Sequence, residues 1–249
     1  MSKDELNRNK LTDTIRANIA THGQHLTLVQ GGEVPRFAYT IGLLQPVGFE
    51  LVLAGANVLD AAEVAQVLNG LATVCKSGTA DLGQPVVLDS LESLGAFRLQ
   101  KVDPSWVDVM LLGAIEHHGR ADVRAMQVLP DADHWSLDTP DLTQLWNANA
   151  QPVWAGLRQP WTYPFAPDAI ATTNLAALRG ARISEAARWE QDQWELFAGP
   201  GPDVLPEHAR MVPLATLLAI DPTLQPVVQL DVGCALWRDD QAGDWQEWV

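Results

Sequence analysis

One helical pattern does most to fix how the first half of this chain can fold. Between residues 58 and 75, apolar side chains recur at intervals of three and four: Val64, Val67, Leu68, Leu71 and Cys75. This spacing is typical of a helix that buries one side. Three segments with the alternation or apolar run of β-strands precede it, at 24–30, 36–41 and 50–55. The helix therefore has sheet residues to cover, and we expect α and β elements packed together.

The same stretch carries its own start and stop signals. We expect Asn57 to cap the helix by accepting from its first-turn N–H groups, and Gly78 to end it. Cys75 lies on the apolar stripe, so it is expected to be a buried small hydrophobe rather than a nucleophile.

The rest of the first 135 residues alternates in a similar way. Helical patterns occur at 4–20 and from Asp103-Pro104 to about His117, and strand patterns at 84–88, 96–102 and 123–129. Proline directly after an acceptor residue is a common helix start. Hairpins mixed with helices indicate an α+β fold, with a mixed or antiparallel sheet and packed helices.

A change of composition divides the chain. Residues 136–167 are rich in proline and tryptophan, and we expect an ordered connection there, because several tryptophans are costly to leave in water. Residues 168–249 predict a second, smaller α+β unit, in which the strand patterns at 169–174 and 180–187 could pair and Pro213 starts a short helix. The predicted organisation is 1–135, 136–167 and 168–249.

The chain is strongly acidic, with 16 Lys and Arg against 31 Asp and Glu and a formal net charge of −15. A field of this sign repels phosphate backbones and anionic lipid surfaces, so we expect no nucleic-acid or membrane partner. Two explanations remain open: the charge serves solubility, or an acidic face meets a basic protein partner.

The sequence also predicts a cytoplasmic location. Its start has no apolar signal segment, and no apolar run approaches the ~18 residues that a membrane helix needs. Cys75 and Cys234 are isolated, which is typical of a reducing compartment.

No familiar catalytic or metal motif is present. The chain has no paired Cys-x-x-Cys, no His-Glu-x-x-His, no Gly-x-Ser-x-Gly and no glycine-rich phosphate loop. His117 and His118 are adjacent, so on a helix they point about 100° apart and cannot chelate together. We therefore predict no catalytic residue, metal or cofactor.

Tyr39 is one of only two tyrosines and lies in the alternating string Phe37-Ala38-Tyr39-Thr40-Ile41-Gly42-Leu43. A buried phenol needs a hydrogen-bond partner. Either this is a core strand that ends in a glycine turn, or Tyr39 lines a pocket together with Glu50.

Over roughly residues 10–135 the chain resembles a bacterial family of unassigned activity, domain of unknown function 4262. The resemblance rests on motif positions whose role it leaves open: His22, Gly23, Tyr39, Thr40, Gly42, Glu50 and Gln127. The chain departs from the family pattern at three places. Gln24 stands where a tryptophan is usual, and Gly48-Phe49 where His-Pro is usual, so a site built on those residues would be lost here. The segment 127–131 keeps only part of the usual turn, in which a Trp-Pro-Asp-like string follows the glutamine.

Residues 165–249 resemble a second bacterial family, domain of unknown function 2185, grouped with the immunity protein 33 type of toxin systems. Aromatic, Asp-Pro and Gly positions carry this resemblance, and it implies a candidate interface that includes Trp194, Asp221, Trp237 and Asp239. The favoured function is thus a non-catalytic, immunity-like protein that binds a basic, toxin-like protein. The alternatives are an enzyme or small-molecule-binding protein of unknown reaction, with its pocket near Tyr39 and Glu50, and an accessory domain without a ligand. The oligomeric state is left open.

Overall fold

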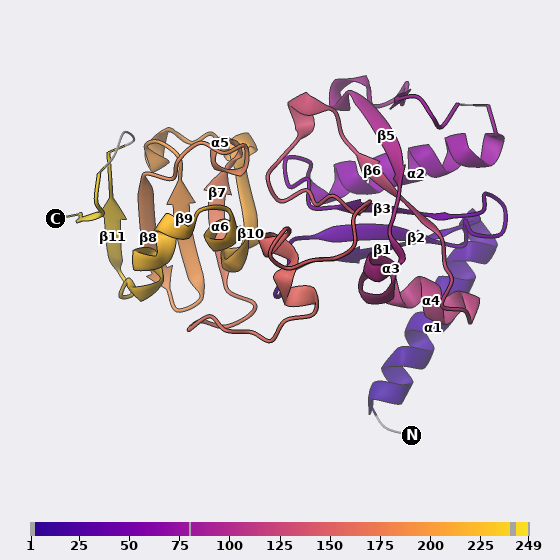
Figure 1. The fold of residues 1–249 in the computed structure, drawn as a ribbon, viewed down its shortest axis with the longest axis horizontal. Coiled ribbons are helices and arrows are strands. Elements are labelled where there is room, and N and C mark those ends of the chain that lie inside the picture. The colour runs from indigo at the N-terminus through magenta and orange to yellow at the C-terminus, as the bar shows by residue number, and fades with distance from the viewer. Residues whose placement is uncertain (1–2, 80, 240–242, 249) are drawn as a thin grey trace.

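The chain folds into two units, each built around its own six-stranded sheet (Figure 1). The computed structural model describes residues 3–79, 81–239 and 243–248. Both sheets are mixed and both carry packed helices, so the predicted α+β class is confirmed. No helix among these residues is both long and apolar enough to cross a bilayer.

The first sheet has the order β1-β2-β3-β6-β5-β4. Its strands are β1 (His25–Val29), β2 (Phe37–Ile41), β3 (Glu50–Ala54), β4 (Val86–Val87), β5 (Ala96–Lys101) and β6 (Ala125–Leu129). β3 and β6 are parallel, with Glu50 opposite Ala125. The other neighbouring strands pair antiparallel.

Helix α2 (Ala61–Ser77) covers one face of this sheet with the predicted apolar stripe (Figure 1). Gly78 ends the helix in the left-handed conformation, as expected. The expected Asn57 cap is wrong. Asp60 caps the helix and forms a reciprocal capping box with Glu63, because Asn57 is buried and donates to Asp138 instead.

The opposite face is covered by α1 (Lys3–His22), α3 (Pro104–Met110), α4 (Leu112–His118) and the 3₁₀ helix η3 (Pro152–Leu157). A single helix from 104 to 117 was expected. The structure breaks it at Leu111, whose φ of −100° and ψ of 38° leave the helical region. The break lets α4 approach the sheet at Gly113, where a Cβ would lie 2.9 Å from the Tyr39 hydroxyl.

The connection, residues 136–167, contains η3, and η2 (Ala132–His134) precedes it. Trp154 is buried and packs edge-on against Phe37 and Trp106. The first unit therefore completes its core with residues that lie beyond position 135.

The second sheet has the order β10-β7-β9-β8-β11-β12. Its strands are β7 (Ile170–Asn174), β8 (Glu185–Glu190), β9 (Gln193–Phe197), β10 (Ala209–Pro213), β11 (Cys234–Trp237) and β12 (Gln246–Glu247). The expected pairing of 169–174 with 180–187 is wrong. β7 pairs parallel with β9, and β8 pairs antiparallel with β9, because the tight turn between β8 and β9 makes them a hairpin that leaves β7 outside.

The core of the second unit lies under its helices, which are α5 (Leu175–Leu178), α6 (Leu214–Ile220) and the short 3₁₀ segments η4 (Gly201–Asp203), η5 (Pro206–His208) and η6 (Pro222–Gln229). Pro213 precedes α6, as predicted.

The two units contact each other through backbone carbonyls. Arg210 of β10 donates to the carbonyls of Asn57 and Val58 in the first unit. Arg179 donates to the carbonyl of Asp133, and the Leu137 N–H donates to the carbonyl of Leu178. These bonds fix the orientation of the second unit against the first.

Candidate functional site

Three of the family-like motif residues, Thr40, Gly42 and Glu50, meet at one buried carboxylate. The side chain of Glu50 is fully buried. Its Oε1 accepts from the N–H groups of Gly42 (2.9 Å) and Leu44 (3.1 Å), and its Oε2 accepts from the Leu43 N–H (3.2 Å) and the Thr40 hydroxyl (2.8 Å). We call these residues the carboxylate nest.

The local sequence explains why the nest forms. Gly42 has a φ of 110°, which L side chains rarely adopt, and the turn there aims three successive N–H groups inward. A Cβ at Gly42 would lie 3.1 Å from Ile19 of α1. Thr40 also accepts from the Leu51 N–H (2.8 Å), so its hydroxyl links β2 to β3.

His118 is the partner that the sequence did not reveal. Its Nε2 lies 2.8 Å from Glu50 Oε1, and the imidazole is only 6% exposed. Since Glu50 accepts from all its other neighbours, Nε2 carries the proton in this contact. The sequence signal was weak: a histidine in the last turn of a helix, 68 positions from Glu50.

Two further histidines lie beside this pair. His117 packs edge-on against His118, with ring centroids 5.0 Å apart. The side-chain amide of Asn18 in α1 donates to His25 Nδ1 at 2.9 Å. Burial lowers the pKa of His25, and the nearby His117 adds to the shift. Burial also lowers the pKa of His117, helped by His118 and Arg16 and opposed by Glu50.

Tyr39 is a core residue. It is 4% exposed, stacks on Phe37 and accepts the Gly113 N–H at 3.2 Å. Burial raises the pKa of its hydroxyl. The described cavities of the molecule are lined by neither Tyr39 nor Glu50.

The remaining motif positions also serve the fold. Gly23 follows α1 in the left-handed conformation, and its N–H donates to Ile19, while His22 is exposed at the helix end. Gln127 is fully buried on β6. Its amide donates to the carbonyl of Pro140 (2.7 Å) and accepts the Leu142 N–H (3.0 Å).

In the second unit, the four candidate interface residues separate. Trp194 is 1% exposed and lies in the core, a position that offers no surface to a partner. Asp221 caps η6 and binds Arg238 at 2.9 Å. Trp237 and Asp239 lie on the surface beside it.

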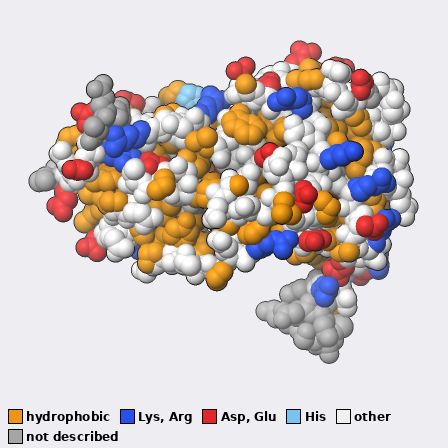
Figure 2. Space-filling view, viewed as in Figure 1, with side chains coloured by type: hydrophobic (Ala, Val, Ile, Leu, Met, Phe, Trp, Pro, Cys, Tyr) orange, Lys and Arg blue, Asp and Glu red, His pale blue; other side chains and the backbone are white. Residues whose placement is uncertain are grey.

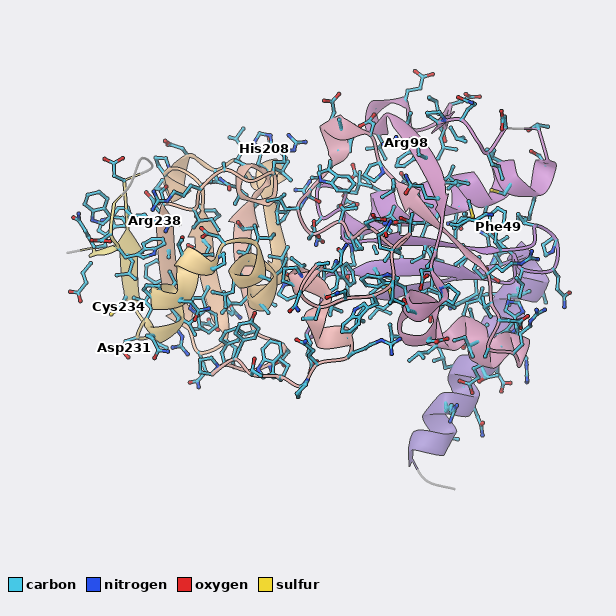
Figure 3. The ribbon with its side chains drawn as sticks, viewed as in Figure 1. Phe49, Arg98, His208, Asp231, Cys234 and Arg238 are labelled. Carbon is cyan, nitrogen blue, oxygen red and sulfur yellow. The ribbon has the colours of Figure 1, made fainter. Side chains whose placement is uncertain are left out.

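Arg238 was not anticipated. It is buried, donates to the Ile183 carbonyl (2.7 Å) and the Thr223 hydroxyl (2.7 Å), and stacks on Trp245. Figure 3 shows it at the upper side of the second unit, away from Asp231 and Cys234 at its lower edge.

The largest described cavity is also in the second unit. It has a volume of about 950 Å³ and lies over β8, β9 and β11, and we call it the sheet groove. Its apolar lining includes Trp189, Phe197, Val204, Leu230, Leu236 and Trp248. Four carboxylates line it as well: Glu185, Glu195, Asp231 and Glu247. No Lys, Arg or His among the described residues lines it.

Within the described part of the chain, no group of three or more His, Cys, Asp or Glu side chains is arranged to hold a metal ion. Of the two arrangements above, the carboxylate nest is closed and the sheet groove is open. Only the groove presents a volume that another molecule could enter.

Residues 18–136 match the family described as Domain of unknown function (DUF4262). Searches of curated proteins and of solved structures find no match to this chain. None of the comparisons supports the resemblance of the second unit to the immunity-type family. The chain thus carries a DUF4262 domain at residues 18–136, with the carboxylate nest inside it and the sheet groove outside it.

Proposed function

We propose that this is a non-catalytic, cytoplasmic binding protein whose second unit holds a basic protein partner in the sheet groove. One observation carries the proposal: an apolar groove of about 950 Å³ has four carboxylates and no cationic side chain among its described lining residues. Apolar lining gives a partner area to bury, and a single sign of charge selects the partner.

The four carboxylates of the groove differ in their hydrogen bonding and exposure. Glu195 accepts the Trp189 indole N–H at 2.8 Å, and Glu185 accepts the Gly201 N–H at 2.7 Å. Asp231 and Glu247 are exposed at the rim. Rim carboxylates add mainly to the rate of encounter with a cationic partner. The net charge of −15 on the whole chain acts in the same direction.

Exposed tryptophans supply the anchors. Trp189 is 53% exposed and Trp248 is 54% exposed, and both line the groove. Figure 2 shows hydrophobic side chains gathered on the second unit, with acidic side chains along its outer margin. Tryptophan is among the residues that most often dominate binding energy at protein interfaces.

The immunity-like part of the proposal concerns the identity of the partner. A toxin with a basic active site would meet an acidic groove, and docking there would block it. The resemblance of the second unit to immunity proteins and the charge of the groove support this assignment.

The experiment is capture from native lysate at low salt, followed by binding measurements with the purified candidate. Asp231→Lys with Glu247→Lys reverses the rim charge. Asp89→Lys with Asp108→Lys makes the same change in net charge on exposed positions of the first unit. We expect a basic protein whose association slows at least tenfold in the rim variant and at high salt, but not in the control. Equal loss in both variants, or a salt-independent rate, would contradict the proposal.

A second candidate is an enzyme or small-molecule-binding protein. The observation that favours it is the Glu50–His118 contact, since a buried carboxylate that orients an imidazole is a common acid–base arrangement. A thermal-shift screen of small molecules on the wild type and on His118→Gln tests it. A compound that stabilises the wild type and not the variant would support this candidate over the groove.

A further inference from the structure

The segment Ser136–Leu142 lies along the first unit in an unusual way. It passes the carboxyl ends of β3 and β6, which is where sheets with parallel strands commonly bind ligands. Ser136, Asp138 and Leu142 are each fully buried. We call this segment the strap. The family match ends at residue 136, so almost all of the strap lies outside the matched domain, while Asn57, Asp103 and Gln127, which hold it, lie inside.

The contacts to the strap resemble those made to a bound peptide. Gln127 grips its backbone twice, through the carbonyl of Pro140 and the N–H of Leu142. The Asp103 N–H donates to the carbonyl of Leu142 at 2.8 Å. The Trp154 indole donates to the carbonyl of Asp138 at 2.9 Å. The strap turns at its start, where the Thr139 N–H donates to the carbonyl of Ser136 at 3.0 Å, so main-chain recognition of this kind fits a peptide turn of varied sequence.

One side chain of the strap is recognised as well. The Asp138 carboxylate accepts from the Asn57 amide and from the Ser136 hydroxyl. The guanidinium of Arg36 stands near it, and its Nε has no hydrogen-bond partner among the described residues. The buried Asn57 amide, with the half-buried Arg36 guanidinium nearby, makes a position that suits a carboxylate.

The loop that follows β3 is shaped for this approach. At Gly55, a Cβ would collide with the carbonyl oxygen of Asp138. The next residue, Ala56, has a φ of 53° although it is not glycine, and it is fully buried. Such backbone strain is retained mainly where the surrounding structure demands it, and it concentrates at ligand sites.

We propose that the matched domain has, at the carboxyl ends of β3 and β6, a binding site for a carboxylate carried on a peptide turn, and that the strap fills this site as a built-in competitor. Its ligand would be an acidic peptide, with the strap of this chain as the model for its chemistry. The site is separate from the sheet groove and from the carboxylate nest.

Chemical rescue tests the carboxylate position. Asp138→Ala leaves Asn57 and Arg36 facing a small hole, and we expect the melting temperature to fall by roughly 5 °C. About 100 mM acetate should restore about 2 °C in this variant, relative to chloride at the same ionic strength. Asp133→Ala, which removes an exposed carboxylate just before the strap, is the matched control. If acetate raised the melting temperatures of the wild type and both variants equally, or raised none of them, the proposal would be overturned.

A peptide tests the backbone part of the site. A peptide with the sequence of residues 135–142 should bind Asp138→Ala at least tenfold more tightly than the same peptide with asparagine at the position of Asp138. Equal affinities would overturn the proposal.

Amide hydrogen exchange on the wild type keeps the question answerable if Asp138→Ala does not fold. A strap that can leave its site should expose the Leu142 N–H at least tenfold faster than the core amides of α2, and Asn57→Ala should speed this exchange alone. Exchange of Leu142 together with α2 in both proteins would show that the strap never leaves, and would overturn the proposal.

Discussion

The two units place their polar residues differently: the first buries them, and the second exposes them around a groove. In the first unit, a carboxylate, a hydroxyl and an imidazole are turned inward and bind one another around Glu50. In the second, carboxylates and tryptophans surround an open groove, and Trp189 and Trp248 are about half exposed. Motif residues in a domain of unknown activity can therefore report on folding, while the open groove lies outside residues 18–136, which the family model matches.

The largest effect should come from the nest. Glu50→Ala leaves three N–H groups and a threonine hydroxyl without their acceptor inside the protein, so we expect a loss of about 3–5 kcal/mol in the free energy of unfolding, measured by urea denaturation. Glu195→Ala in the groove should change it by less than about 0.5 kcal/mol. If both variants were equally stable, the contrast between the units would fail.

Arg238 is a buried charged residue of the second unit, and in this respect it resembles Glu50 of the first. Arg238→Ala removes a buried cation that binds Asp221 and stacks on Trp245, and we expect a loss of about 2–4 kcal/mol. Urea denaturation measures this loss. The exposed Arg98 of the first unit, labelled in Figure 3, provides the control substitution Arg98→Ala. A loss no greater than that of the control would show that the second unit has no internal polar centre.

The histidines beside the nest predict how stability depends on pH. Burial lowers the pKa of His25 and His117 in the folded state, so between pH 7 and 5 the unfolded chain binds more protons than the folded one. Stability should therefore fall as the pH drops below about 6.5. His117→Gln should flatten this slope in urea titrations across that range. An equal flattening by His208→Gln, at an exposed position of the second unit, would show that the effect is not specific to the cluster.

The smallest effect on stability should be at the groove surface. Trp189→Ala should change the free energy of unfolding by about 0.5 kcal/mol or less, because the side chain is 53% exposed. Trp194→Ala, close by on the neighbouring strand, should cost about 3–5 kcal/mol. For partner binding we expect the reverse order. Relative to the stability that each variant loses, Trp189→Ala should weaken binding more than Trp194→Ala. If Trp189→Ala left binding intact, the groove would not be the interface.

The parts of the fold that local spacing determines were predicted well. The stripe of α2, the strands around it and the proline start of α3 depend on residues within a few positions of one another. The cap of α2 was missed because Asn57 is engaged by Asp138, which lies far along the chain. The pairing of β7 with β9 was missed for a similar reason, since the choice of neighbour depends on the hairpin between them.

The site was harder to predict than the fold. Glu50, Thr40 and Gly42 were identified as motif positions, but their common role is visible only once the Gly42 turn aims its N–H groups inward. His118 and Arg238 had no local signal, because their partners are brought to them by tertiary packing. The acidic composition indicated a charged face, but composition does not say where charged residues lie in the fold. Only the folded sheet shows where carboxylates and tryptophans gather.

The parallel pair at the centre of the first sheet also has a consequence for folding during synthesis. β3 pairs with β6, so the middle of the sheet stays open until Ala125 has been made, and one face is uncovered until Trp154 follows. The nest, in contrast, joins residues only about ten positions apart. Non-local pairing slows folding, and ribosomes add roughly 5–20 residues each second. We therefore expect β2 and β3, already joined around Glu50, to wait on the ribosome for seconds before the rest of the domain reaches them.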